Sequence, residues 1–321
     1  MESKKLFGFL EFLKKSITII SKNGTLMAIV TSIYIIIASL FFVLNISTAK
    51  PMIYDFSTKA MLLPSLDPRS LVFAQVLNTT LSDFKTFLGI ELTFFLALFV
   101  IALISQTAII LLIGAAYKEE KITHVDLILR VPQPLVRMFI TSFHVTLLRV
   151  GFLYIGFFSV MVPTIMVSGY NKIVSKMILW GLVVLVVGLY LYFSVVWVLS
   201  LVVSVLEDCS GIEALGKAGR LVKGRKLGGF LLNLILNLLS YVFSHLSSKM
   251  IVVNVKQFEL TQVLYLFFLM GFLCSLVMFE FQAYTVLYFE CKKNHGEEIE
   301  LQGSVEYSKI PRIPLVDEDL P

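Results

Sequence analysis

Six long apolar runs decide what this chain can fold into. Each is dominated by Leu, Ile, Val and Phe, and a helix of about 20 such residues crosses the hydrocarbon of a bilayer. Membrane β-strands would instead alternate polar and apolar residues over segments of about 10 residues. The sequence therefore predicts an all-α fold, a polytopic transmembrane helical bundle with about six spans. The runs are Leu26–Asn45, Leu88–Ala116, Met138–Val167, Met177–Leu206, Gly228–Val252 and Val263–Phe289.

Composition excludes a water-soluble fold. Hydrophobic residues make up 57% of the chain and charged residues only 15%, whereas an ordinary soluble domain is about one quarter charged. A core of this size cannot hide so much apolar surface from water. The net charge of +5 does not indicate nucleic-acid binding, because the basic residues lie between the apolar runs.

The distribution of Lys and Arg predicts the orientation. The N-terminal segment, two of the connections and the C-terminal tail hold 18 of the 27 Lys and Arg residues. Cytoplasmic segments carry such an excess, so both termini are expected in the cytoplasm. The membrane itself is expected to be the plasma membrane or a membrane of the secretory pathway. Asn78-Thr79-Thr80 is an N-glycosylation acceptor in the long first connection, which this orientation places on the other side.

Three parts of the chain are expected. Residues 1–25 form a cytoplasmic amphipathic segment, residues 26–290 the six-helix membrane domain, and residues 291–321 a polar cytoplasmic tail. The tail and the cytoplasmic loops are candidates for binding protein partners. The lipid bilayer is the other expected partner.

The connection after the fourth run predicts a short amphipathic helix on the cytoplasmic surface. Ser210 is placed to cap it, and Glu213 and Lys217 are spaced to pair. The apolar stripe comprises Ile212, Leu215, Gly219 and Val222. This helix either recognises lipid headgroups or partners, or only anchors the chain. A weaker second copy starts at Thr123 and stops at Pro132. The candidate headgroup contacts are Lys217, Arg220, Lys223, Arg225 and Lys226.

Ionisable residues inside spans are costly and mark candidate functional sites. Arg149 and Glu280 lie at similar depths in the third and sixth runs, so they are expected to face each other as an intramembrane pair. The pair either locks two helices together or lines an ion or substrate path. A second candidate is a polar stripe that faces the bundle interior. It comprises Asn233, Asn237, Ser240 and Ser244 on the fifth run. Polar groups on two sides of the sixth run place that helix at the centre of the bundle.

The sequence holds no catalytic, metal or cofactor signature. The three cysteines, Cys209, Cys274 and Cys291, have no metal or redox spacing. Cys291 follows a predicted span and is a candidate for S-palmitoylation. The chain is therefore expected to be neither an enzyme nor a cofactor-binding protein.

Two stretches resemble known families. Glu207-Asp208, Ala214-Leu215 and the segment from Arg220 to Arg225 resemble the membrane domain found beside some bacterial glycerophosphodiester phosphodiesterases. The end of the last run, from Gln282 to Lys293, is similar to a plant family of uncharacterised six-span proteins. These resemblances imply membrane residence. The phosphodiesterase activity belongs to a separate soluble domain.

The function expected from these features is that of a non-enzymatic multi-pass membrane protein. It would act through helix packing, lipid contact or partner binding. The alternative is a small-solute or ion transporter or channel that uses the polar faces of the third, fifth and sixth spans. A membrane-embedded lipid enzyme would need clustered carboxylates or histidines at the headgroup level, which the sequence does not offer.

Overall fold

The computed structural model describes Lys14, Thr18 and residues 24–120, 122–167, 172–223, 226–253 and 260–294. All regular structure in these ranges is helical, which confirms the all-α prediction. The predicted amphipathic segment at residues 1–25 lies almost wholly outside the described residues, as does the tail after Asn294.

Six helices are long and apolar enough to cross a membrane, and each contains one of the predicted runs. The chain is thus built as a multi-pass membrane protein. The six are α2 (Gly24–Leu62), α3 (Leu71–Tyr117), α5 (Pro132–Val167), α6 (Lys172–Leu206), α8 (Lys226–Val253) and α9 (Leu260–Asn294). The short elements are the 3-10 helix η1 (Leu63–Ser65), α4 (His124–Arg130) and α7 (Gly211–Leu221).

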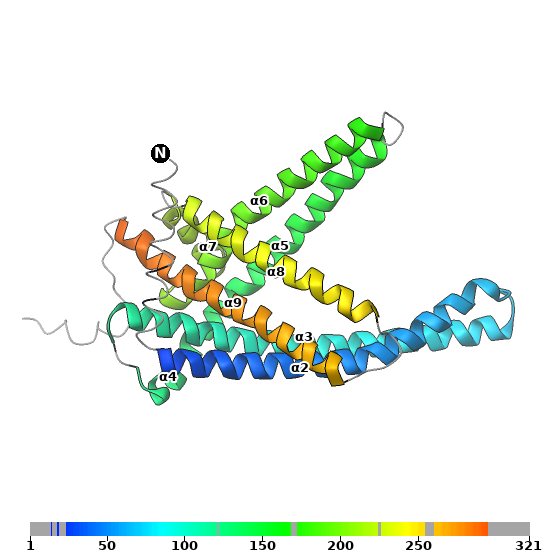
Figure 1. Cartoon of the computed structure of the whole chain (residues 1–321), viewed down its shortest axis with the longest axis horizontal. Helices are drawn as coiled ribbons and strands as arrows, with labels where there is room; N and C mark the ends of the chain where they lie inside the picture. The colour runs from blue at the N-terminus through cyan, green and yellow to red at the C-terminus, as the bar shows by residue number, and fades with distance from the viewer. Residues whose placement is uncertain are drawn as a thin grey trace, which may run out of the picture.

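The long helices form two hairpins with α8 and α9 beside them (Figure 1). One hairpin joins α2 to α3, the other joins α5 to α6, and the two diverge from a shared end. Helix α9 packs against α2, α3, α6 and α8. The predicted central position of the sixth span is therefore confirmed.

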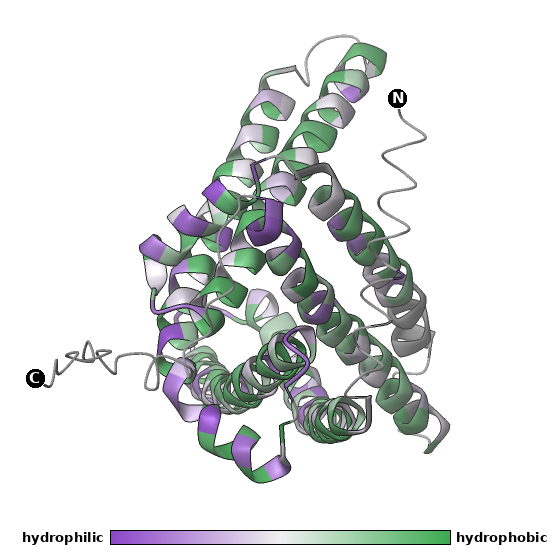
Figure 2. Ribbon diagram, turned by 90° about the vertical axis from the view of Figure 1, so that its left-hand side faces the viewer, coloured by the Kyte–Doolittle hydropathy of each residue, from purple (hydrophilic) through white to green (hydrophobic). Residues whose placement is uncertain are grey.

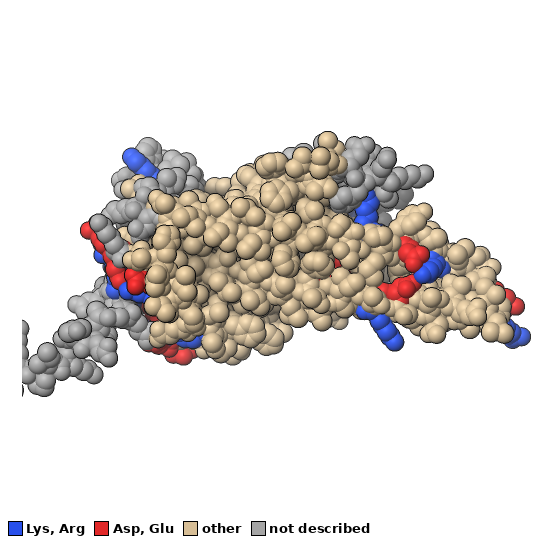
Figure 3. Space-filling model, turned by 90° about the horizontal axis from the view of Figure 1, so that it is seen from below, with Lys and Arg blue, Asp and Glu red and all other residues tan. Residues whose placement is uncertain are grey.

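Charged residues gather at opposite ends of the molecule. Seen from below, a broad zone of uncharged side chains separates them (Figure 3). We call one end the basic end, because it holds α4, α7 and most of the described basic residues outside the spans. These are Lys118, Arg130, Arg137, Lys217, Arg220, Lys223, Lys292 and Lys293. The other, which holds the turn between α2 and α3, is the hairpin end. Helix α2 begins and α9 ends at the basic end, as an even number of crossings requires (Figure 1).

The buried core is concentrated near the basic end. It is formed by the last turns of α3, the second half of α6 and the second half of α9. Gly114 allows this closeness, because a Cβ there would lie 3.2 Å from Leu206. The rings of Tyr117 and Phe289 stack with centroids 4.3 Å apart. Dense packing fixes the helix ends relative to one another, so groups placed there are held rigidly.

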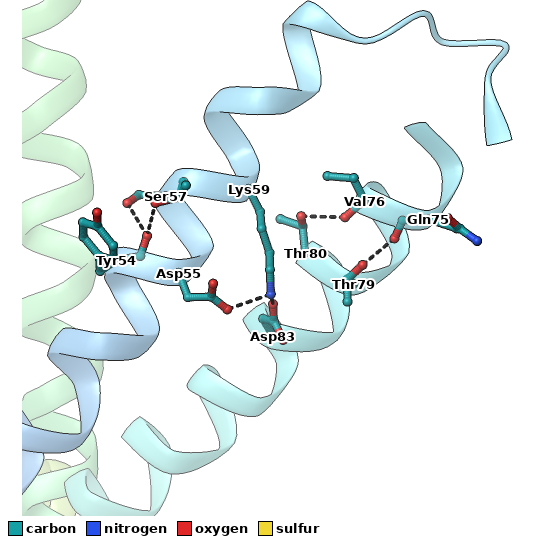
Figure 4. Close-up of polar contacts among 10 residues, drawn as sticks. Tyr54, Asp55, Ser57, Lys59, Gln75, Val76, Thr79, Thr80 and Asp83 are labelled. Carbon is teal, nitrogen blue, oxygen red and sulfur yellow. Dashed lines mark hydrogen bonds and ion pairs between the residues drawn. The ribbon is translucent and has the colours of Figure 1, made fainter. Parts of the chain in front are cut away.

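The predicted long first connection is mostly helix. Helices α2 and α3 contain 39 and 47 residues, and at about 1.5 Å per residue both exceed a hydrocarbon core about 30 Å thick. The Asn45 amide donates a hydrogen bond of 3.0 Å to Glu91 about one bilayer thickness from the basic end. Beyond it, Lys59 bridges Asp55 at 2.7 Å and Asp83 at 2.6 Å (Figure 4). The hairpin is therefore longer than a bilayer core is thick.

Candidate functional site

The strongest polar site lies at the basic end and centres on Glu207. This carboxylate directly follows α6 and its side chain is only 9% exposed. Its Oε1 accepts a 2.5 Å hydrogen bond from the Tyr288 hydroxyl and lies 3.4 Å from Lys292 Nζ. Its Oε2 pairs with Lys217 of α7. We call these four residues the Glu207 cluster; it ties α6, α7 and α9 together.

The surroundings of Glu207 favour its ionised carboxylate form. Burial alone would raise the pKa of this carboxyl group. The hydrogen bonds from Lys217 and Tyr288, with the charges of Lys217 and Lys292, outweigh burial and lower the pKa below its ordinary value. Glu207 is therefore ionised at neutral pH.

A second set of contacts fixes the start of α7 to α5. Arg137 pairs with Asp208, and the Gly211 amide donates a 2.9 Å hydrogen bond to the Thr141 hydroxyl. Gly211 has a φ of +58°, and a Cβ there would lie 3.3 Å from the His144 ring. This position therefore favours glycine. Ser210 occupies the predicted N-cap position, but its side chain forms no capping hydrogen bond; Thr141 supplies the acceptor.

The short helix predicted after the fourth run is present as α7, but its buried face differs in part from the predicted apolar stripe. Its buried face comprises Gly211, Ala214, Ala218, Leu221 and Val222. Of the predicted stripe, Val222 is buried, whereas Ile212 is 74% exposed. Small alanine side chains let the α7 backbone approach the ends of α5, α6 and α9 closely, and Lys217 turns inward to Glu207. Among the predicted headgroup contacts, Lys217 is therefore part of the bundle.

What remains on the outer side of α7 is both basic and apolar. Arg220, Lys223 and Ile212 are exposed. Arg225 lies outside the described residues, and of Lys226 only the backbone is described. Helix α4, whose predicted start at Thr123 and stop at Pro132 are confirmed, exposes Val125, Ile128 and Leu129. Figure 2 looks onto this end and shows hydrophilic positions gathered in front of predominantly hydrophobic helices.

The cysteines near this end are inside the fold. Cys209 and Cys291 are both buried, and Cys291 is 1% exposed. Burial, followed by the negative charge of Glu207, raises the pKa of the Cys209 thiol, so it is a poor nucleophile. S-palmitoylation of Cys291 stays a prediction, and in the packed structure the thiol is shielded. Within the described ranges, no group of three or more His, Cys, Asp or Glu side chains is placed to hold a metal ion.

Arg149 and Glu280 lie within electrostatic range but are not joined directly in the described structure. The Arg149 guanidinium lies over the Trp197 ring of α6, 5.9 Å from its centroid, and its buried Nε atom has no hydrogen-bond partner. Helix α6 contacts both α5 and α9, so its Trp197 ring packs against the Arg149 guanidinium. Arg149 and Glu280 therefore attract each other over a longer distance than the predicted direct pair requires.

The polar stripe of α8 is divided. Asn233 is fully buried and donates a 3.1 Å hydrogen bond to the Leu191 carbonyl of α6. Asn237 donates 2.8 Å bonds to the carbonyl and side-chain oxygens of Asn233. Ser240 is half-buried and Ser244 is exposed. Asn233 thus joins α8 to α6, as predicted. Asn237 is exposed and bonds within α8, and Ser244 does not face the interior.

Asn78 lies on an exposed face of α3, beyond the Asn45–Glu91 contact. The Thr80 hydroxyl of the acceptor triplet donates a 2.7 Å hydrogen bond to the Val76 carbonyl (Figure 4). A sugar would therefore have to be attached before α3 forms. Glycosylation at Asn78 stays a prediction.

Comparison with protein families gives one match over most of the chain. A family model described as a domain of unknown function, DUF8558, matches residues 1–308. The chain belongs to the DUF8558 family. Because one DUF8558 match covers all six long helices, the bundle and the Glu207 cluster are parts of one family unit. Comparisons with curated proteins and with solved structures find no match. The resemblances to the plant family and to the phosphodiesterase-associated membrane domain stay predictions.

Proposed function

We propose that this protein is a non-enzymatic membrane protein whose basic end faces the cytosol and binds anionic lipid headgroups. The observation that carries the proposal is the orientation of α7. The Glu207 cluster holds this helix against the bundle. Arg220 and Lys223 are exposed at its C-terminal end, and the apolar side chain of Ile212 is exposed at its first turn.

The physical basis is the negative surface potential of the cytoplasmic leaflet. Each cation near that surface contributes on the order of 1 kcal/mol of attraction. Exposed apolar side chains on α4 and α7 can enter the headgroup region while neighbouring cations meet phosphates, which is the usual arrangement of interfacial helices. The bundle then only positions these apolar and basic side chains, and binding involves no chemical reaction.

The buried polar groups inside the bundle hold helices together, which supports a non-enzymatic role. Arg149 and Trp197 pack together, and Asn233 joins α8 to α6, so both stabilise helix contacts. A shallow hollow of about 620 Å³ between α5 and α6 is lined by apolar residues such as Gly156, Val160 and Val183. Neither Arg149 nor Glu280 lines this hollow. It suits lipid chains better than a polar solute.

The double substitution Arg220→Gln/Lys223→Gln tests the proposal. Removing two surface cations, at about 1 kcal/mol each, is expected to weaken binding of phosphatidylserine by about thirtyfold. The purified protein would be studied in neutral-lipid nanodiscs titrated with phosphatidylserine, with bound lipid counted by native mass spectrometry. The fold should be unaffected, because both side chains are exposed.

The matched control is Lys85→Gln/Lys176→Gln, which removes two exposed cations at the hairpin end. This variant should retain phosphatidylserine as the unmodified protein does. Equal binding by all three proteins would contradict the proposal, as would equal loss in both variants, because the site would then not lie on α7.

A further inference from the structure

The last helix of the bundle ends beside α7. Helix α9 runs to Asn294 and contacts α7 at the basic end (Figure 1). Lys292, two residues before that end, and Lys217 of α7 pair with the two oxygens of one carboxylate, that of Glu207. The Glu207 cluster therefore fixes the point from which the chain continues after α9, and this point lies next to the basic part of α7.

The exposed side of α7 carries two cations that lack a counter-charge. Arg220 and Lys223 are exposed and form no salt bridge within the part of the chain that the structure describes. Arg137 and Lys217, at the same end, each pair with a carboxylate. The one carboxylate of α7 itself is Glu213, which lies about 10 Å before Arg220 along the helix axis. An acidic segment is therefore the natural complement of this surface.

The sequence that follows α9 has the matching charge. Glu297, Glu298 and Glu300 come within six residues of Asn294, and no Lys or Arg occurs between Asn294 and Lys309. The four residues from Asn294 to Glu298 span at most about 14 Å when extended. Three carboxylates are thus tied closely to the end of α9.

We propose that residues 297–300 cover Arg220 and Lys223 of the same chain and compete with anionic headgroups for them. Arg220 lies about 5 Å along the helix axis from Lys217, which is beside the end of α9, so the short tether reaches it. A segment tethered this closely has an effective concentration in the millimolar range. Exposed ion pairs too weak to hold a separate peptide are then sufficient. The competition rests on the proposed function, whereas the contact itself does not.

A second acidic run in the same tail provides a matched comparison. Asp317, Glu318 and Asp319 hold the same number of carboxylates on a longer tether. Glu318 is 24 residues from Asn294, whereas Glu298 is four residues from it. Effective concentration falls with about the 3/2 power of tether length, so it is about fifteenfold lower for the second run. The proposal therefore assigns the contact to the first run.

Disulfide cross-linking tests the contact directly. The variant Lys223→Cys/Glu298→Cys would be reconstituted in phosphatidylcholine vesicles and mildly oxidised. It is expected to form a disulfide within one chain, identified by mass spectrometry of the digested monomer. The matched control, Lys223→Cys/Glu318→Cys, is expected to form several-fold less, because its tether is longer. The native cysteines Cys209, Cys274 and Cys291 are buried. Adding phosphatidylserine to the vesicles should lower the yield of the first disulfide.

Removing the acidic charges tests the competition. Glu297→Gln/Glu298→Gln/Glu300→Gln is expected to bind phosphatidylserine about fivefold more tightly than the unmodified protein, because two exposed ion pairs no longer have to be broken. Asp317→Asn/Glu318→Gln/Asp319→Asn changes the net charge equally and is expected to bind as the unmodified protein does. Equal tightening in both variants would contradict the competition, since general repulsion of the tail by the anionic leaflet would explain it.

The two experiments separate this inference from the proposed function. If no variant bound phosphatidylserine while the disulfide to position 298 formed, the headgroup function and the competition would fail and the contact would stand. Equal disulfide yields at positions 298 and 318, or no disulfide at either, would overturn the contact even if phosphatidylserine bound. A disulfide that joins two chains, seen as a dimer on a non-reducing gel, would also overturn it.

Discussion

Replacing Glu207 by glutamine is expected to lower the free energy of unfolding by about 3 kcal/mol, because the buried Lys292 and the half-buried Lys217 lose the carboxylate that they share. Lys292 and Lys217 both pair with this carboxylate. Glutamine retains the side-chain shape and an acceptor for the Tyr288 hydroxyl, so the loss of stability measures the effect of the Glu207 charge. The measurement is equilibrium unfolding in mixed detergent micelles with increasing SDS.

The control is Asp208→Asn, one residue away. Asp208 is 55% exposed and pairs with Arg137, and an exposed pair contributes less than about 1 kcal/mol. Adding Lys217→Met and Lys292→Met to Glu207→Gln should recover part of the lost stability, because the two lysine charges that faced Glu207 are then removed. If Glu207→Gln and Asp208→Asn were equally mild, the Glu207 cluster would not hold the basic end together.

The same variant predicts a pH dependence. The pKa of Glu207 is lowered in the folded protein, whereas the unfolded chain has the ordinary Glu value of about 4.3. Its contribution is therefore complete above that value and is lost as the pH falls through the lower pKa of the folded state. The stability difference between the unmodified protein and Glu207→Gln should thus be constant near neutrality and shrink below about pH 4.3.

Replacing Gly229 by valine is expected to destabilise the bundle by about 2 kcal/mol or more, because it overfills a close helix contact. A Cβ at Gly229 would lie 2.7 Å from Val195 of α6 and 3.3 Å from Leu287 of α9. Valine at position 195 is stiff about χ1 and cannot turn away freely. Helix α8 would therefore have to shift outward, which thermal unfolding in detergent would record as a lower melting temperature.

Gly228→Val is the matched control in the same turn. A Cβ at Gly228 meets nothing within 4 Å, so only helix propensity changes, and it favours valine over glycine by less than about half a kcal/mol. Comparable melting temperatures for Gly228→Val and Gly229→Val would show that α8 does not pack against α6 and α9 as described.

The spans could be predicted from the sequence because they depend on one physical quantity, the apolar length of a helix. The central position of α9 also followed, since polar residues on two faces of one helix require neighbours on both sides. The position of Asn233 in the α8 stripe was predictable for the same reason: its amide needs a partner and finds the Leu191 carbonyl.

The packing of α7 could not be predicted from its hydrophobic pattern. Its contact face is made of Ala214 and Ala218, which score as only weakly apolar but permit close backbone approach, whereas Ile212 faces outward. The Glu207 cluster was also missed. Glu207 and Tyr288 are 81 residues apart, and the only local signal was a carboxylate at the end of a span followed by a basic helix.

Helix rotation explains the outcome for Arg149 and Glu280. Counting residues from the helix ends gives depth, and their depths are similar. Whether two side chains meet depends also on the rotation of each helix and on what lies between them. Helix α6 places Trp197 under the guanidinium, and no count along the chain contains that information.

The central claim is that the basic end faces the cytosol and the α2–α3 hairpin faces the opposite compartment. Single substitutions Lys223→Cys and Ser65→Cys place exposed thiols at the two ends. The variants would be synthesised into sealed microsomes and treated with a membrane-impermeant maleimide. We expect Lys223→Cys to be labelled in intact vesicles and Ser65→Cys only after detergent opens them. Labelling of both positions in intact vesicles, or of Ser65→Cys alone, would contradict this account.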